Sequence, residues 1–368
     1  MSNLVKVKDV IERVNTKEDR FNTDRLYYVG GEHFQSRALT VDDRGIIKGS
    51  TIGPMFYYGF KSNDFLLVSR NPHLRKAGLV NFDGICSEKT FVLHTKDERI
   101  LLQKFMPFIF QNERFWKYAI ANKHGSTNFF VNWSTLADYS FELPSIEQQK
   151  AISKLLWALN DTKKAYEDLI QKTDELVKSQ FIEMFGEPSK SDEAVPLERA
   201  FEIRDDLRKP LNDVERSQMK EGQLYPYYGA NGQVDTINDY MIDGQALCLA
   251  EDCGAYGAGD VTSYIIKGRS WVNNHAHVLF PRKECDIEYA NAFFRILDMS
   301  EYVSGTTRLK LTQGKMKEIP VVLPPMNEQR TFADIVEQSD KSKFELQYVN
   351  RNVKEMVTCL QKKIRLNR

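Results

Sequence analysis

An internal repeat is the feature that most constrains how this 368-residue chain can fold. The sequence Leu-Pro-Ser-Ile-Glu-Gln-Gln-Lys, which begins at Leu143, recurs as Leu-Pro-Pro-Met-Asn-Glu-Gln-Arg from Leu323, an offset of about half the chain. Two further pairs keep the same order at nearly the same offset: 125–128 with 305–308, and 65–68 with 246–249. Three matching blocks in one order indicate two copies of one structural plan.

A long helix is predicted after each Leu-Pro block, at residues 145–187 and 324–368, because apolar or small residues recur every three or four positions. The first stripe is Ile152, Leu155, Leu159, Thr162, Tyr166, Leu169, Thr173 and Leu176, and the second is Phe332, Ile335, Ser339, Ser342, Leu346, Val349, Val353 and Met356. A helix over residues 147–185 would be about 58 Å long. Each stripe could pack on its own domain, but two equal stripes can bury each other, so we expect a paired spacer.

The segments before the helices, residues 1–144 and 188–323, differ in sequence and are typical of mixed structure. Their short β-rich runs, such as 66–69, 90–94, 263–267 and 276–280, are separated by Gly, Asn and Asp. The predicted fold class is therefore α+β: two globular mixed α/β domains, separated by two long helices, in an internal pseudo-twofold repeat. Similar scaffolds with dissimilar interiors indicate one task performed on two different targets.

Charge and cysteine content limit the possible partners and the cellular compartment of the protein. The 51 Lys and Arg balance 51 Asp and Glu, so any surface for nucleic acid must be local. No apolar run approaches the roughly 18 residues of a membrane-spanning helix, and we expect no membrane association. The five cysteines lack Cys-x-x-Cys spacing, and the N-terminal stretch from Met1 to Asn15 is charged rather than apolar. We therefore expect a cytoplasmic protein in a reducing compartment.

The usual catalytic signatures are missing. The sequence holds no GxxxxGK[ST] phosphate loop, no GxSxG elbow, no HExxH zinc helix, and no Asp or Asn followed by Pro-Pro and an aromatic residue, the adenine-methylation signature. Cys248 and Cys253 with His275 and His277 could form a zinc set, but their spacing favours buried cysteines and a half-buried strand with alternating histidines. The glycine-rich stretch 254–260 lacks a lysine, so a turn is favoured over a nucleotide loop.

Local positive charge is more informative. Residues 61–135 hold eleven Lys or Arg against six Asp or Glu, and residues 303–318 hold four, including Lys310 and Lys315, against one acid. Both segments also contain polar residues that can anchor phosphates and bond to base edges. Such runs are usually solvated faces, but their recurrence at the same place in both repeats favours DNA binding.

A second candidate for ligand contact is the run Tyr-Pro-Tyr-Tyr-Gly-Ala-Asn-Gly at residues 225–232. Its turn could bring Tyr228 and the Asn231 amide close to a ligand. Asn-Gly is also a favoured two-residue hairpin turn. Both interpretations can hold together.

The combination of motifs resembles the specificity subunits of type I restriction-modification systems. The resemblance rests on the two Leu-Pro-x-x-x-x-Gln blocks, their continuation into long helices, the helix end Lys-Ser-Gln-Phe-Ile-Glu-Met-Phe-Gly at residues 178–186, and residues 227–232. It covers essentially the whole chain. It implies two target recognition domains, residues 1–144 and 188–323, each of which binds one half of a split DNA site, held apart by an antiparallel pair of helices.

The resemblance also implies partners. Two methylation subunits dock on the specificity subunit in this family, and two motor-nuclease subunits join some complexes. Adenine methylation with S-adenosylmethionine, and cleavage that needs ATP and Mg, belong to those partner chains. This chain is therefore expected to bind double-stranded DNA, to bind no cofactor or metal itself and to be non-catalytic.

The expected DNA contacts follow the resemblance and the repeat. They are Arg70, Arg75, Lys76, Ser126, Thr127 and Asn128 in the first domain, and Thr306, Thr307 and Arg308 in the second. Two other interpretations stay open at this point. One is a self-contained DNA methyltransferase or nuclease with a duplicated architecture, and the other is a coiled-coil scaffold whose globular domains bind protein.

Overall fold

The computed structural model describes residues 3–191, 194–306 and 308–363. Two compact units are present: unit 1 is Met1–Ala165 with Arg351–Arg368, and unit 2 is Tyr166–Asn350. The long helices α5 (Ile146–Phe185) and α10 (Met326–Lys363) each contribute to both units. Among the described residues, no helix is long and apolar enough to cross a membrane.

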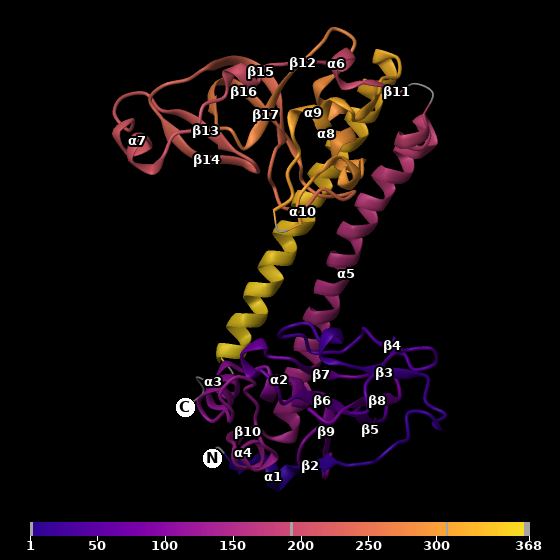
Figure 1. Ribbon diagram of the computed structural model, residues 1–368. Coiled ribbons are helices and arrows are strands. Elements are labelled where there is room, and N and C mark those ends of the chain that lie inside the picture. The colour runs from indigo at the N-terminus through magenta and orange to yellow at the C-terminus, as the bar shows by residue number, and fades with distance from the viewer. Residues whose placement is uncertain (1–2, 192–193, 307, 364–368) are drawn as a thin grey trace. The chain divides into compact units, whose positions relative to one another are not determined.

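Unit 1 contains two four-stranded sheets (Figure 1). The first has the order β2 (Ile11–Val14), β9 (Thr90–Thr95), β6 (Phe65–Val68) and β7 (Ala77–Leu79), and the second has the order β4 (Gly45–Ile46), β3 (Tyr27–Val29), β8 (Gly84–Ser87) and β5 (Phe56–Phe60). A separate antiparallel pair joins β1 (Asn3–Lys6) to β10 (Ser140–Leu143). The helices are α1 (Val7–Val10), α2 (Met106–Phe110), α3 (Glu113–Ala121) and α4 (Trp133–Asp138), with 3₁₀ turns η1 (Gly31–His33), η2 (Pro72–Leu74) and η3 (Gln103–Phe105).

Strand β6 explains how one apolar run serves two cores. Phe65 and Leu67 join the cluster that contains residues of α2 and α3, whereas Leu66 and Val68 join the cluster with the second sheet. Successive side chains of a strand point to opposite faces. A strand buried on both faces reads as a continuous apolar run, as this one does.

Unit 2 is built on a six-stranded sheet with the order β12 (Phe201–Ile203), β17 (Ala276–Pro281), β15 (Ile242–Ala250), β16 (Ser263–Val272), β13 (Tyr225–Gly229) and β14 (Gly232–Ile237). A two-stranded pair joins β11 (Ala194–Pro196) to β18 (Pro320–Val322). The helices are α6 (Leu197–Ala200), α7 (Asp213–Gln218), α8 (Ile287–Ile296) and α9 (Gln313–Lys317), with 3₁₀ turns η4 (Pro188–Lys190), η5 (Asp205–Leu207) and η6 (Ser300–Tyr302). Strand β15 alternates between two cores as β6 does, with Leu247 and Leu249 on one side and Ala246 and Cys248 on the other.

The C-terminal part of α5 packs against the N-terminal part of α10 within unit 2. The ring centroids of Phe181 and Phe332 lie 5.4 Å apart, and Lys343 Nζ lies 2.7 Å from Asp174 Oδ1. Residue numbers fall along α5 as they rise along α10, so these segments are antiparallel. The α+β fold with two long helices, predicted from the repeat, is confirmed.

The predicted stripe on α5 is only partly right, because Ile152 packs against the unit 1 core but three of its leucines are exposed. Leu155, Leu169 and Leu176 are 48%, 47% and 63% exposed. The buried apolar side chains of α5 are instead Leu156, in the unit 1 core, and Phe181 and Phe185, which pack with residues of α8 in the unit 2 core. A strict heptad stripe suits helices that bury only each other, whereas each end of α5 is also part of a domain core.

A buried glutamine explains the repeated Leu-Pro-x-x-x-x-Gln block. Gln149 Nε2 donates to the carbonyl oxygens of Ile100 and Pro144, and Gln329 Nε2 donates to those of Glu284 and Pro324, at 2.7–2.9 Å. The Oε1 atoms accept from Leu102 N and Asp286 N. Each glutamine therefore ties the first turn of a long helix to a loop of its own unit, and its amide satisfies backbone groups that would otherwise be buried without partners.

Candidate nucleic-acid interface

Two polar loops occupy the same place in the two units. In unit 1, His124 and Phe130 exchange backbone hydrogen bonds of 2.8 and 3.0 Å. In unit 2, Ser304 and Lys310 do the same at 3.0 and 2.8 Å. The two pairs are separated by the offset of the Leu-Pro blocks, so the repeat found in the sequence is also an equivalence in three dimensions.

The same glycine starts each loop for the same reason. Gly125 has a φ of 90° and Gly305 a φ of 102°, in the region that side chains rarely adopt. A Cβ at either position would also collide with the carbonyl oxygen three residues later, that of Asn128 or Arg308. Only glycine fits both requirements, which places Asn128 and Arg308 at equivalent points of the two loops.

Each loop is attached to the end of a central strand. Val131 N donates to Ser69 O at 2.9 Å just after β6, and Leu311 N donates to Glu251 O at 2.8 Å just after β15. Ser69 and Glu251 are therefore equivalent, so the sequence match of 65–68 with 246–249 is one residue out of register. The residues that follow them, Arg70 and Asp252, lie beside the two loops.

The unit 1 candidates divide into two groups. Arg70 is exposed and forms a β-bridge to Phe130, so it lies next to the exposed residues Ser126, Thr127 and Asn128. Arg75 and Lys76 are instead half-buried and hold the domain together: Arg75 makes two bonds of 2.7 and 3.0 Å to the Glu113 carboxylate, and Lys76 Nζ donates to Gly31 O at 2.6 Å. Arg75 and Lys76 stay predictions as DNA contacts.

The unit 2 candidates also separate. Thr306, Arg308 and Lys310 are exposed on the loop 304–310. Thr307 lies outside the described residues. Lys315 is exposed on α9, where its Nζ bonds to Glu318 at 2.7 Å.

The run at residues 225–232 forms the hairpin β13–β14, with exposed Asn231 in its turn. Tyr228 is half-buried and stacks on Tyr264 with ring centroids 5.6 Å apart, and burial raises the pKa of its hydroxyl. In the part of the chain that the structure describes, no hydrogen bond or ring contact joins Tyr228 or Asn231 to the loop 304–310. A ligand role for these two residues stays a prediction.

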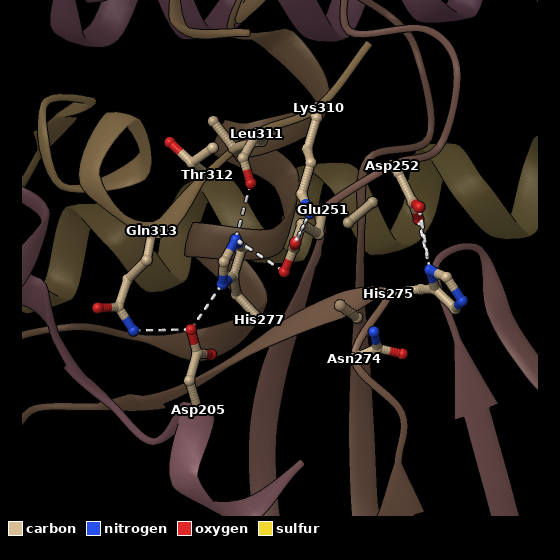
Figure 2. Close-up of polar contacts among 12 residues, drawn as sticks. Asp205, Glu251, Asp252, Asn274, His275, His277, Lys310, Leu311, Thr312 and Gln313 are labelled. Atoms are coloured by element: carbon tan, nitrogen blue, oxygen red, sulfur yellow. Dashed lines mark hydrogen bonds and ion pairs between the residues drawn. The ribbon is translucent and has the colours of Figure 1, made fainter. Parts of the chain in front are cut away.

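His277 is the centre of a buried polar cluster beside the loop 304–310 (Figure 2). Its side chain is 0% exposed. Strand β17 is buried on both faces from Ala276 to Leu279, so the predicted half-buried strand is wrong. Nδ1 lies 2.8 Å from Asp205 Oδ2, and Nε2 lies 2.9 Å from the carbonyl oxygen of Leu311. Both partners are hydrogen-bond acceptors, so this position suits N–H donors on the ring.

Two carboxylates of this cluster accept further hydrogen bonds. Asp205 also accepts from Gln313 Nε2 at 2.8 Å, and Glu251 accepts from Lys310 Nζ at 2.7 Å. Burial raises the pKa of Asp205, but the hydrogen bond and charge of His277, together with Gln313 and Arg208, outweigh burial and hold that pKa below its usual value. Burial also raises the pKa of Glu251, but the bonds from Lys310 and Arg208 outweigh it, so this pKa is lowered as well.

A second group lies at the surface beside this cluster. Asp252, whose side chain is 9% exposed, accepts from Arg308 and from His275 Nδ1, which lies 3.0 Å from both carboxylate oxygens. The Arg308 and His275 side chains are 70% and 42% exposed. Sequence reasoning missed Asp205, Glu251 and Asp252. The only signal was an acidic pair that directly follows a buried apolar strand.

The zinc set considered from the sequence is not assembled. Cys248 is buried in β15, and burial raises the pKa of its thiol to about 12, which disfavours the thiolate that zinc binds. Among the described residues, no three His, Cys, Asp or Glu side chains are placed to hold a metal ion. At the surface of the site, the exposed Arg308 and Lys310 side chains carry hydrogen-bond donors.

Comparison with known proteins places these features in a family. The family model for the type I restriction modification DNA specificity domain matches residues 2–173 and 201–354, one match for each repeat. A Haemophilus influenzae protein described as a putative type I restriction enzyme specificity subunit is 29% identical over 145 residues, 39% of this chain and 36% of that protein. The EcoprrI specificity subunit of Escherichia coli is 26% identical over 129 residues, 35% of this chain and 31% of that subunit. The matches thus span about a third of the length of these relatives.

Solved structures agree on the fold. The crystal structure of a type I restriction-modification S subunit from M. genitalium has a TM-score of 0.60 at 16% identity, over 98% of this chain and 96% of that one. A chain from a structure of a type I R-M system has a TM-score of 0.54 at 15% identity, over 98% and 96%. The family match covers both repeats, and the chain belongs to the type I restriction modification DNA specificity domain family.

Proposed function

We propose that this chain is the specificity subunit of a type I restriction-modification complex, and that each unit reads one half of a bipartite DNA site. The observation that carries the proposal is the pair of equivalent loops, 124–130 and 304–310, which share one backbone design. Their side chains differ, with Asn128 in one loop where Arg308 stands in the other. One scaffold with two sets of polar side chains suits a protein that reads two different half-sites.

The proposal extends to partners and cofactors. Two methylation subunits would dock on this chain, and motor-nuclease subunits would complete a restriction complex. S-adenosylmethionine, ATP and Mg would be bound by those partners, and this chain would contribute no catalytic group. Its setting would be cytoplasmic, where chromosomal DNA lies.

The unbroken helix α5 gives the proposal a second testable part. Its 40 residues correspond to a length of about 60 Å. If the long helices set the spacing, inserting about one heptad into both should lengthen the gap between the half-sites and leave both half-site sequences unchanged. An unchanged gap would count against this part alone.

The main test is methylation-sensitive genome sequencing of a host that expresses the chain with its neighbouring methylation subunit, beside a host that lacks the chain. We expect a bipartite adenine motif only when the chain is present. A purified complex that yields no new motif would contradict the proposal.

Salt dependence separates the remaining alternatives. A reader that neutralises about six phosphates should lose roughly a thousandfold in affinity between about 50 and 200 mM salt. A scaffold with protein-binding domains predicts no such DNA affinity. A self-contained enzyme predicts methylation or cleavage by the purified chain alone.

A further inference from the structure

We propose that Arg308, oriented by the Asp252 carboxylate together with His275, reads a guanine in the major groove of the unit 2 half-site. The inference rests on the proposed function and names the base that one unit reads. Its starting point is a three-residue group from three segments: the end of β15, the start of β17, and the loop 304–310 (Figure 2 shows Asp252 and His275).

The pairing with Asp252 favours base reading over phosphate anchoring. A phosphate anchor is strongest as a free positive charge, whereas Arg308 is already bonded to a carboxylate that is only 9% exposed. That bond reduces its net attraction for phosphate but fixes the direction of the guanidinium. Arginine has five donors in a rigid fork, and at 70% exposure most of them remain accessible. The fork matches guanine O6 and N7.

The loop that carries Arg308 is held firmly. Lys310 Nζ bonds to Glu251, Leu311 accepts from buried His277, and Gln313 bonds to Asp205, all at 2.7–2.9 Å. These contacts fix the chain just after Arg308 to the central sheet. A reader that is ordered before binding loses less conformational entropy on the DNA.

Unit 1 lacks this arrangement at the equivalent positions. The residue equivalent to Asp252 is Arg70, and the residue equivalent to Arg308 is Asn128. Without an acid after β6, unit 1 cannot orient an arginine in the same way. The two half-sites should therefore differ in the position that these loops read, and Asn128→Ala serves as the matched control.

The first experiment replaces each guanine of the unit 2 half-site in turn by 7-deazaguanine, which lacks the N7 acceptor. Wild-type protein, in complex with its methylation subunits, should lose about tenfold in affinity at one guanine. The Arg308→Ala variant should bind more weakly to the normal site and lose nothing further at that guanine. Arg308→Lys keeps the positive charge but lacks the guanidinium fork, so it too should lose no further affinity when that guanine is replaced by 7-deazaguanine.

The Asp252→Asn variant distinguishes orientation from simple charge. Removing one negative charge should leave non-specific affinity unchanged or raise it, while the ratio of specific to non-specific affinity falls by about tenfold. If Asp252→Asn keeps full discrimination, or if Arg308→Ala responds to 7-deazaguanine like the wild type, the inference is overturned. Asn128→Ala should change only the other half-site.

Failure of the inference can be told from failure of the proposed function. A complex without salt-dependent, bipartite DNA recognition refutes the proposed function. A complex that recognises a bipartite site, but in which no guanine of the unit 2 half-site is coupled to Arg308, refutes only the guanine assignment.

Discussion

Replacing His277 with Phe tests the buried cluster most directly. Phe is somewhat larger than His and removes both ring nitrogens, so the change leaves no cavity. The carbonyl oxygen of Leu311 and the carboxylate of Asp205 each lose a partner, at 2.9 and 2.8 Å. Asp205 keeps hydrogen bonds from Val278 N at 3.1 Å and from Gln313 at 2.8 Å, so its carboxylate still has donors after the substitution.

The magnitude follows from these two losses. A buried carbonyl without a donor costs about 1–3 kcal/mol, and a lost charge-assisted bond costs about 1.5–3 kcal/mol. The expected destabilisation of unit 2 is therefore about 3–5 kcal/mol, a large part of the roughly 5–15 kcal/mol typical of a domain.

Hydrogen exchange of the full-length protein measures this effect by segment. Amides of β15 and β17 should lose protection by roughly a hundred- to several-thousandfold, since about 1.4 kcal/mol corresponds to tenfold. Amides of β6 and β9 in unit 1 provide the internal control. His275→Phe, at a side chain that is 42% exposed, is the matched variant and should cost under about 1 kcal/mol. Unchanged protection of β15 and β17 in His277→Phe would refute the reasoning.

Unit 2 supports three other predictions. Phe181→Ala removes a side chain that is 0% exposed and should lower the free energy of unfolding, measured with urea, by about 3–5 kcal/mol. A decrease below about 1 kcal/mol would contradict the packing described for Phe181. Gln329→Leu should lower the free energy of unfolding by about 2–4 kcal/mol, because three buried backbone groups lose their hydrogen-bond partner. Gln338→Leu, on the exposed face of α10, is the control and should leave that free energy nearly unchanged. Asp205 and Glu251 both have lowered pKa values in the folded state, so the stability they contribute is present above their unfolded pKa values and lost as pH falls through the folded ones. The urea midpoint should drop below about pH 4.5, and Asp205→Asn should flatten that drop.

Sequence reasoning was strongest where the signal lies in neighbouring residues. The Leu-Pro-x-x-x-x-Gln blocks recur, and α5 and α10 start at Ile146 and Met326, the corresponding position of each block. The loops at Gly125 and Gly305 are equivalent for the same reason, because a tight turn with positive φ depends on local backbone chemistry.

Sequence reasoning was weaker where a choice depended on which surface lay opposite. Part of the α5 stripe was misassigned because Leu169 and Leu176 satisfy the helical spacing as well as Val177 and Phe181 do. Only the cores of the two units decide which of these residues is covered. Arg75 was an expected DNA contact from the family resemblance, and that expectation stays a prediction. Its partner Glu113 lies 38 positions further along the chain, so the ion pair could not be identified from spacing.

The sequence by itself thus determined the duplicated plan, the long helices, the two polar loops and the family. The tertiary structure alone decided which side chains act together: Asp252 meets His275 across 23 positions and Arg308 across 56, and His277 meets Asp205 across 72. Local periodicity is encoded in adjacent residues, but the pairing of buried charges depends on strand order and register, which no spacing along the chain specifies.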